Sequence, residues 1–295
     1  MNVSDHGKGM KPWRGQSWPR TMTGRSALVE PLPHHISCDS LHVSFKADPQ
    51  KIANLLPPGL EPLESGEGWV MIAEMAKVSV EDPDNGWKAP ARSSYNECVL
   101  GFYCRFGDRL GRYSALVWVD RDWSMGMGPI FGWSKRLAEV DRTRHQRANP
   151  HFAGGPYVLG GTVSRYGNTI VEMAIRFDEE PKSLERLPGH GGSTFLYRYV
   201  ASPSPDVDDL EQLFELQLDN VVTRNIREGA GSLHFGKAPD EELAELGEVT
   251  VTGGYAYERG WTTGRNARLI YDYHASSPSG EKPDLNSTHA TSKPQ

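Results

Sequence analysis

The sequence has few cysteines and no pattern typical of a metal site. Its three cysteines, Cys38, Cys98 and Cys104, show no CxxC spacing and are odd in number. We interpret them as reduced thiols, because a disulfide framework needs pairs and a zinc site needs closely spaced ligands. The ten histidines form no HxH or HExxH pattern. Metal chemistry therefore has no support from the sequence.

Long apolar runs and an excess of positive charge are also missing. No stretch of 18 apolar residues occurs and no apolar segment follows the N-terminus, so the sequence predicts neither a transmembrane span nor a secretory signal. The net charge of −6 argues against nucleic acid or an anionic membrane as the main partner. We expect a soluble, cytoplasmic protein.

What the sequence does contain is many short strands separated by turns rich in Gly and Pro. Aromatic and β-branched residues mark these segments. The predicted strands are 41–45, 69–80, 95–106, 113–119, 157–165, 169–177, 194–200, 213–226, 232–235, 248–257 and 267–273. Little room is left for crossover helices, which favours an α+β, mostly β fold whose antiparallel sheet curls or closes into a barrel.

Few helices are expected, and one has clear boundaries. Asp48 is a typical N-cap, Pro49 suits the first helical position, and Pro57-Pro58-Gly59 ends the segment. A second short helix is predicted over 240–246. These elements make one domain over 26–275, between a flexible N-terminal arm (1–25) and a disordered polar tail (276–295).

The segment 125–140, MGMGPIFGWSKRLAEV, carries the main candidate for chemistry. It places Lys135 after an apolar, glycine-rich turn and next to a permanent cation, Arg136. Apolar surroundings and a like charge both disfavour an ammonium, and a neutral lysine amine attacks carbonyl carbons. The alternative is a solvent-exposed Lys-Arg pair at a strand end, which is the usual situation for these residues.

Two glutamates, Glu74 and Glu97, lie within mostly apolar predicted strands. Strand alternation would direct both side chains toward the interior of the sheet. A carboxylate buried there must be paired or protonated, because burying it alone is costly. Each could instead face solvent or lie at a sheet edge.

Together these features resemble the acetoacetate decarboxylase superfamily, from about Leu41 to Tyr273. The matching motifs are 55–62 (LLPPGLEP), the strand with Glu74, 95–97 (YNE), 133–137 (WSKRL) and 268–273 (RLIYDY). Each motif is moderately specific, and their order and spacing are much more so.

The resemblance implies a Schiff-base decarboxylase that acts on a β-keto acid and needs no organic cofactor or metal. Lys135 matches the nucleophilic lysine, and Glu74 and Glu97 match the two active-site glutamates. Arg136 stands where the family often has a second lysine; it keeps the charge but cannot deprotonate. Tyr95 is similar to a tyrosine that some members use for proton transfer.

One departure concerns substrate binding. By our alignment the decarboxylases have an arginine near the substrate carboxylate, and Cys38 stands at about that place. Two alternatives therefore remain. One is a Schiff-base aldolase or dehydratase on a larger 2-keto acid, with Tyr95 and either Tyr271 or Tyr273 transferring protons. The other is a non-catalytic barrel that binds a small ligand.

Assembly is predicted from the same resemblance. Curled sheets of this superfamily tend to associate, and the aromatic N-terminal arm and many strand edges of this chain would otherwise be exposed. We expect a homo-oligomer whose other partner is a small keto acid.

Overall fold

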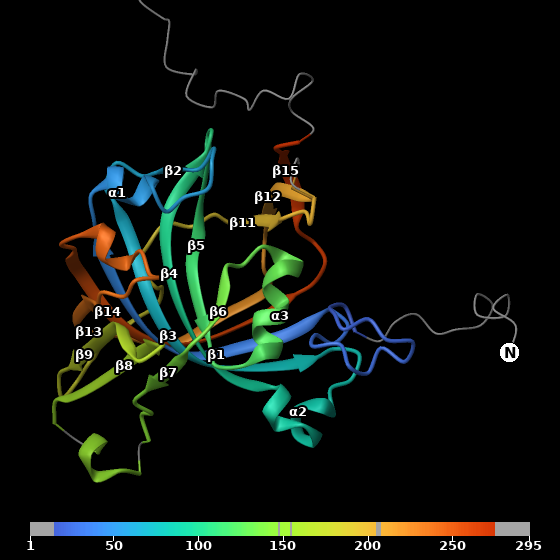
Figure 1. Cartoon of the computed structure of the whole chain (residues 1–295). Coiled ribbons are helices and arrows are strands. Elements are labelled where there is room, and N and C mark those ends of the chain that lie inside the picture. The colour runs from blue at the N-terminus through green and yellow to red at the C-terminus, as the bar shows by residue number, and fades with distance from the viewer. Residues whose placement is uncertain (1–14, 147, 154, 205–207, 275–295) are drawn as a thin grey trace, which may run out of the picture.

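A single large sheet organises the molecule (Figure 1). The structure is a computed structural model that describes residues 15–146, 148–153, 155–204 and 208–274. The strands are β1 (His34–Lys46), β2 (Glu61–Pro62), β3 (Glu67–Ser79), β4 (Ser94–Phe106), β5 (Arg109–Val119), β6 (Lys135–Leu137), β7 (Glu139–Arg142), β8 (Tyr157–Arg165), β9 (Asn168–Phe177), β10 (Lys182–Leu184), β11 (Ser193–Val200), β12 (Leu210–Leu216), β13 (Asp219–Phe235), β14 (Thr250–Thr263) and β15 (Arg268–Asp272).

The main path of the sheet runs β15-β12-β11-β5-β4-β3-β1-β14-β13-β9-β8-β7. Neighbours are antiparallel, except that β5 pairs in parallel with β6 and β11. Within the described residues β15 pairs with β12 and β7 with β8. The mostly β, antiparallel prediction is confirmed, but closure into a barrel is wrong, because the two end strands do not pair with each other.

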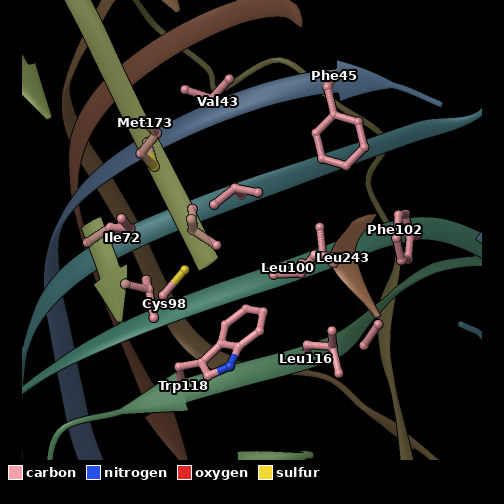
Figure 2. Close-up of a cluster of buried hydrophobic side chains, with 14 of the residues drawn as sticks. Val43, Phe45, Ile72, Cys98, Leu100, Phe102, Leu116, Trp118, Met173 and Leu243 are labelled. Atoms are coloured by element: carbon pink, nitrogen blue, oxygen red, sulfur yellow. The ribbon is translucent and has the colours of Figure 1, made fainter. Parts of the chain in front are cut away.

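Both faces of the curled sheet are covered, which explains why burial needs no closed barrel. On one face the core includes Leu41, Ile72, Leu100 and Trp118; Figure 2 shows part of this cluster. On the opposite face lies a second core that includes Met75, Val99, Val117, Trp123 and Met127. Residues on β3, β4 and β5 alternate between the two, and each fully buried large side chain stabilises the fold by about 1.5–3 kcal/mol.

Helical segments are short: α1 (Pro49–Ala53), α2 (Asn85–Lys88) and α3 (Asp122–Phe131), with 3₁₀ turns at η2 (Pro90–Arg92), η3 (Pro150–Phe152) and η4 (Leu243–Leu246). The start of α1 is as predicted, since Asp48 Oδ1 accepts a hydrogen bond from Gln50 N at 2.9 Å. The helix predicted over 240–246 is only the turn η4, and α3 was not predicted.

Helix α3 occupies the segment interpreted from sequence as a turn. Gly126, Gly128 and Pro129 lie inside it although none of them favours a helix. Tertiary packing requires the small residue at Gly128, because a Cβ there would lie 2.6 Å from the carbonyl oxygen of Trp133. At the end of α3, Gly132 adopts the left-handed conformation (φ 94°) that reverses the chain toward β6.

Some strand boundaries also differ from the prediction. The segment predicted as one strand over 213–226 is divided between β12 and β13, and the predicted strand 232–235 is the end of β13. Residues 1–14 of the predicted arm and the whole predicted tail, 276–295, lie outside the described residues. The described end of the arm runs beside residues 28–29, where Gln16 N donates to Val29 O at 2.9 Å. Among the described helices, none is both long and apolar enough to cross a membrane.

Candidate active site

Strand β6 places two consecutive residues, Lys135 and Arg136, on opposite faces of the sheet. Lys135 is paired with Val117 of β5 and Arg136 with Trp118. Val117 belongs to the core on the α3 side and Trp118 to the other core. Lys135 therefore points toward α3, and Arg136 points away from it, as the alternation of a strand requires.

Lys135 is buried and held by two polar groups. Its Nζ donates to Oε2 of Glu97 on β4 at 2.8 Å and to Oγ of Ser124 on α3 at 3.1 Å. The side chains of Lys135 and Glu97 are 4% and 11% exposed. The rings of Tyr95 and Trp133 lie 5.4 Å from Nζ, so the amine has an apolar and aromatic environment.

Tyr95 lies two residues before Glu97 and shares its face of β4. Its hydroxyl donates to Glu97 Oε2 at 3.3 Å, and its ring packs edge-on against Trp123 with centroids 5.0 Å apart. Burial, followed by the charge of Glu97, raises the pKa of Tyr95 well above its usual value. The phenol stays protonated at neutral pH and remains a proton donor next to Lys135.

Lys135, Glu97 and Tyr95 line one cavity of about 150 Å³, far above the ~10–15 Å³ that one water molecule occupies. Apolar walls come from both the sheet and α3, and include Ile36, Met71, Met75, Val99, Met127 and Trp261. No group of three or more His, Cys, Asp or Glu side chains is arranged to hold a metal ion in the described parts of the chain. The cavity suits a small organic molecule with a carbonyl near Lys135.

Arg136 does not reach this cavity. Its guanidinium donates to Oε2 of Glu241 at 2.7 Å and lies 5.6 Å from the ring of Trp118. Glu241 is fully buried and also accepts from Arg165 at 3.0 Å. Arg136, paired with Glu241, therefore lies on the opposite face of the sheet from Lys135.

Glu74 also lies outside the cavity, although the sequence gives it the same setting as Glu97. On β3, Met71 and Met75 line the cavity, whereas Glu74 projects from the opposite face. Its carboxylate pairs with Arg144 at 3.1 Å, and the two side chains are 38% and 63% exposed. The prediction of an inward-pointing Glu74 is therefore wrong in geometry.

A buried lysine on the active face, Lys77, was missed by the sequence analysis. Its side chain is 3% exposed, forms an ion pair with Glu30, and has its Nζ 4.3 Å from the Trp123 ring. Burial lowers the pKa of Lys77, and the pair with Glu30 only partly offsets this; Arg92 and Lys135 lower it further. The second buried lysine on the face of Lys135 thus comes from β3 and not from the next residue in sequence.

Cys38 lines the cavity as a buried free thiol. Burial raises its pKa to about 11, so the thiol is neutral at pH 7, and Ser40 Oγ donates to its sulfur at 3.1 Å. The alternative proton donors Tyr271 and Tyr273 are not nearby, because both pack against the core on the other face.

Two further arginines do line the cavity, Arg112 on β5 and Arg259 on β14. In the β1–β14 pairing Arg259 is directly opposite Cys38. The sequence offers one signal for Arg259, its alternation with Tyr255, Tyr257 and Trp261. That pattern alone does not say which face of the sheet encloses a cavity.

Comparison with known proteins gives one family model and several similar solved structures. The family model described as acetoacetate decarboxylase matches residues 17–273. An acetoacetate decarboxylase-like enzyme from Sphingomonas wittichii RW1 is 27% identical, with a TM-score of 0.80 over 87% of this chain and 100% of that one. No curated protein sequence matches the chain.

Two other solved structures are also similar to this chain. The enduracididine biosynthesis enzyme MppR complexed with the condensation product of pyruvate and imidazole 4-carboxaldehyde is 25% identical, with a TM-score of 0.78 over 90% of this chain and 99% of that one. An acetoacetate decarboxylase from Legionella pneumophila is 13% identical, with a TM-score of 0.66 over 83% of this chain and 90% of that one, and shares the fold.

Proposed function

The chain belongs to the acetoacetate decarboxylase family, and from this premise we propose that it is a Schiff-base enzyme that condenses a small 2-keto acid with a second carbonyl compound. The observation that carries the proposal is the contiguous set Lys135, Glu97 and Tyr95, which lines a mostly apolar cavity. It contains a nucleophile and a proton donor that are each hydrogen-bonded to the same proton acceptor, Glu97.

The first step makes an iminium. Lys135 passes its proton to Glu97, attacks the ketone carbon, and the ketone oxygen leaves as water. Glu97 returns its proton to the departing water, and the iminium withdraws electrons from the neighbouring carbon, which gives a proton to Glu97 and becomes an enamine. Glu97 accepts from Lys135 at 2.8 Å, a distance suited to proton transfer.

The second step uses the enamine as a carbon nucleophile. It attacks the carbonyl carbon of an aldehyde, and the hydroxyl of Tyr95 protonates the alkoxide that forms. The carbon that attacked gives its second proton back to Tyr95, and the oxygen leaves as water with the proton held by Glu97, which gives a conjugated product. Hydrolysis of the imine then restores Lys135. A protonated Tyr95 supplies the donor this step needs.

Two observations favour condensation. The MppR structure at 25% identity holds a pyruvate–aldehyde condensation product, and Glu74, one of the two glutamates of the decarboxylase pattern, lies outside the cavity. Decarboxylation of a β-keto acid is the second candidate, supported by the family model. It shares the iminium, which then loses CO₂ in place of a proton.

Borohydride reduction in the presence of pyruvate tests the common step. We expect a stable adduct on Lys135 by peptide mass mapping and no adduct in Lys135→Arg. The control Lys237→Arg should leave the adduct unchanged, since Lys237 is exposed and does not line the cavity. Pyruvate with an aromatic aldehyde should then give a conjugated product that absorbs in the ultraviolet.

The outcomes separate the alternatives. CO₂ release from acetoacetate without aldehyde condensation would select the decarboxylase. No adduct with any keto acid would reject both enzymes and leave a non-catalytic ligand-binding protein.

A further inference from the structure

Arg112, at the end of the cavity away from Lys135, has a second arginine, Arg259, near it. Arg112 and Arg259 line the cavity together with Tyr103, Tyr257 and His42. An arginine side chain keeps its charge at any physiological pH, so two positive charges face this space.

Within the described residues neither guanidinium forms a salt bridge. Arg112 Nε donates to Thr194 Oγ1 at 3.2 Å, and the buried Nε of Arg259 has no hydrogen-bond partner. Glu97, the one carboxylate among the residues lining the cavity, is bonded to Lys135 instead.

The charges of the two arginines affect the pKa values of their neighbours. Burial lowers the pKa of Arg112, and the charge of Arg259 lowers it further. Burial lowers the pKa of His42 to about 3, with additional contributions from Arg112 and Arg259. Partly buried like charges without a counter-ion are unfavourable, and an anion bound between them would relieve this cost.

Arg112 is too far from Lys135 to hold the carboxylate next to the imine carbon. Lys135 is paired with Val117, and Arg112 lies five residues earlier on β5. At ~3.3 Å per residue, Val117 and Arg112 are about 17 Å apart along the strand. The side chains of Lys135 and Arg112 span only part of this distance. The space between them fits a substrate chain of several bonds.

We propose that the keto acid carries a second carboxylate, several bonds from its ketone, and that Arg112 and Arg259 bind it while Lys135 forms the imine. This inference rests on the proposed function and adds the substrate class, an oxo dicarboxylate. The segment before β11 encloses the arginine end, since Leu187 lines the cavity and Tyr103 packs against His190 with ring centroids 5.2 Å apart.

Matched pairs of keto acids test the proposal through borohydride trapping on Lys135. The probes are 2-oxoadipate against 2-oxohexanoate and 2-oxoglutarate against 2-oxopentanoate, which have equal chain lengths and differ in the distal carboxylate. We expect half-maximal trapping of at least one dicarboxylate at a concentration 10–100-fold lower than its monocarboxylate. This corresponds to about 1.4–2.8 kcal/mol, the size of a charge-assisted hydrogen bond.

Variants assign the effect to the two arginines. In Arg112→Gln and in Arg259→Gln, the preference for the dicarboxylate should be nearly lost. The concentrations that give half-maximal trapping of the two keto acids should then differ by less than about threefold. The control Arg176→Gln, on an exposed position of β9 outside the cavity, should keep the full preference.

The results separate this inference from the proposed function. Adducts that form equally well with both members of every pair would overturn the anion site and leave the Schiff base intact. A preference that persists in both arginine variants would overturn the assignment to these residues. The comparison in the unmodified protein decides the first point even if a variant fails to fold. No adduct with any probe would reject the proposed function itself.

Discussion

Tyr95 and Lys135 can be separated experimentally although both contact Glu97. Tyr95→Phe removes the proton donor and leaves the amine, its partner and the packing against Trp123 in place. We expect imine trapping to persist while the turnover number for condensation falls by about 10²–10⁴-fold, the usual contribution of general acid catalysis.

Tyr166→Phe is the matched control, since Tyr166 is 80% exposed. Equal loss of trapping and turnover in Tyr95→Phe would show that the tyrosine supports only the structure of the site.

Two buried histidines make the fold sensitive to acid. Burial and the charge of Lys77 lower the pKa of His34 to about 4, and the pKa of His42 is about 3. When the pKa of a histidine is lower in the folded state than in the unfolded state, its full contribution to the free energy of unfolding is present above the unfolded pKa of 6.5. That contribution is lost as the pH falls from 6.5 toward the folded pKa. The loss is about 1.4 kcal/mol per pH unit for each histidine, or about 2 kcal/mol each at pH 5.

Urea denaturation at pH 7 and pH 5 measures this loss. His34→Leu should remove about half of the difference, because both nitrogens of His34 are buried without hydrogen-bond partners. The exposed His234→Leu should not. Equal stability of the unmodified protein at the two pH values would refute the prediction.

Among the elements, the connection from α3 to β6 fixes the position of Lys135. A Cβ on Gly132 would lie 2.7 Å from the backbone of Tyr197, and its φ of 94° is unfavourable for other residues. Gly132→Ala should therefore cost more than the ~1–2 kcal/mol of a left-handed alanine, and imine trapping should weaken as β6 shifts.

Gly167→Ala is the control for Gly132→Ala, because it measures only the free energy that alanine loses by adopting a positive φ. Gly167 also has a positive φ of 78°, but nothing lies within 4 Å of its missing Cβ. The free energy of unfolding of both variants, from denaturant curves, should differ by at least ~1 kcal/mol. Identical values would mean that the Tyr197 contact relaxes freely.

The strands were predictable because alternation and turn residues are local signals. The candidate site was partly predictable for the same reason: Tyr95 and Glu97 are two residues apart on one strand, so they had to share a face. Glu74 and Glu97 could not be told apart, because each lies in an apolar strand and only the tertiary packing decides which face encloses the cavity. Arg259 meets Cys38 through a pairing between distant strands, and Gly128 and Pro129 enter a helix against their local preference.

At the scale of the whole molecule, assembly remains a prediction. The two ends of the sheet, β7 and β15, have an unpaired edge among the described strands, and Val158, Val222 and Leu269 are 47%, 46% and 44% exposed. Exposed edges and apolar side chains favour association between copies. We expect light scattering at micromolar concentration to give a multiple of the mass of one chain, and Leu269→Glu to lower it. A monomeric mass for the unmodified protein would refute the prediction.

The place of β14 in the sheet also affects how the protein is made. β14 lies between β1 and β13, and its pairing with β1 joins segments separated by roughly 200 residues. At ~5–20 residues per second on the ribosome, β1 waits about 10–40 s for this neighbour, with one edge open in the centre of the future sheet. Arg259 arrives with the same strand, so a nascent chain that has already folded around Lys135 still lacks one of the two arginines that line the cavity.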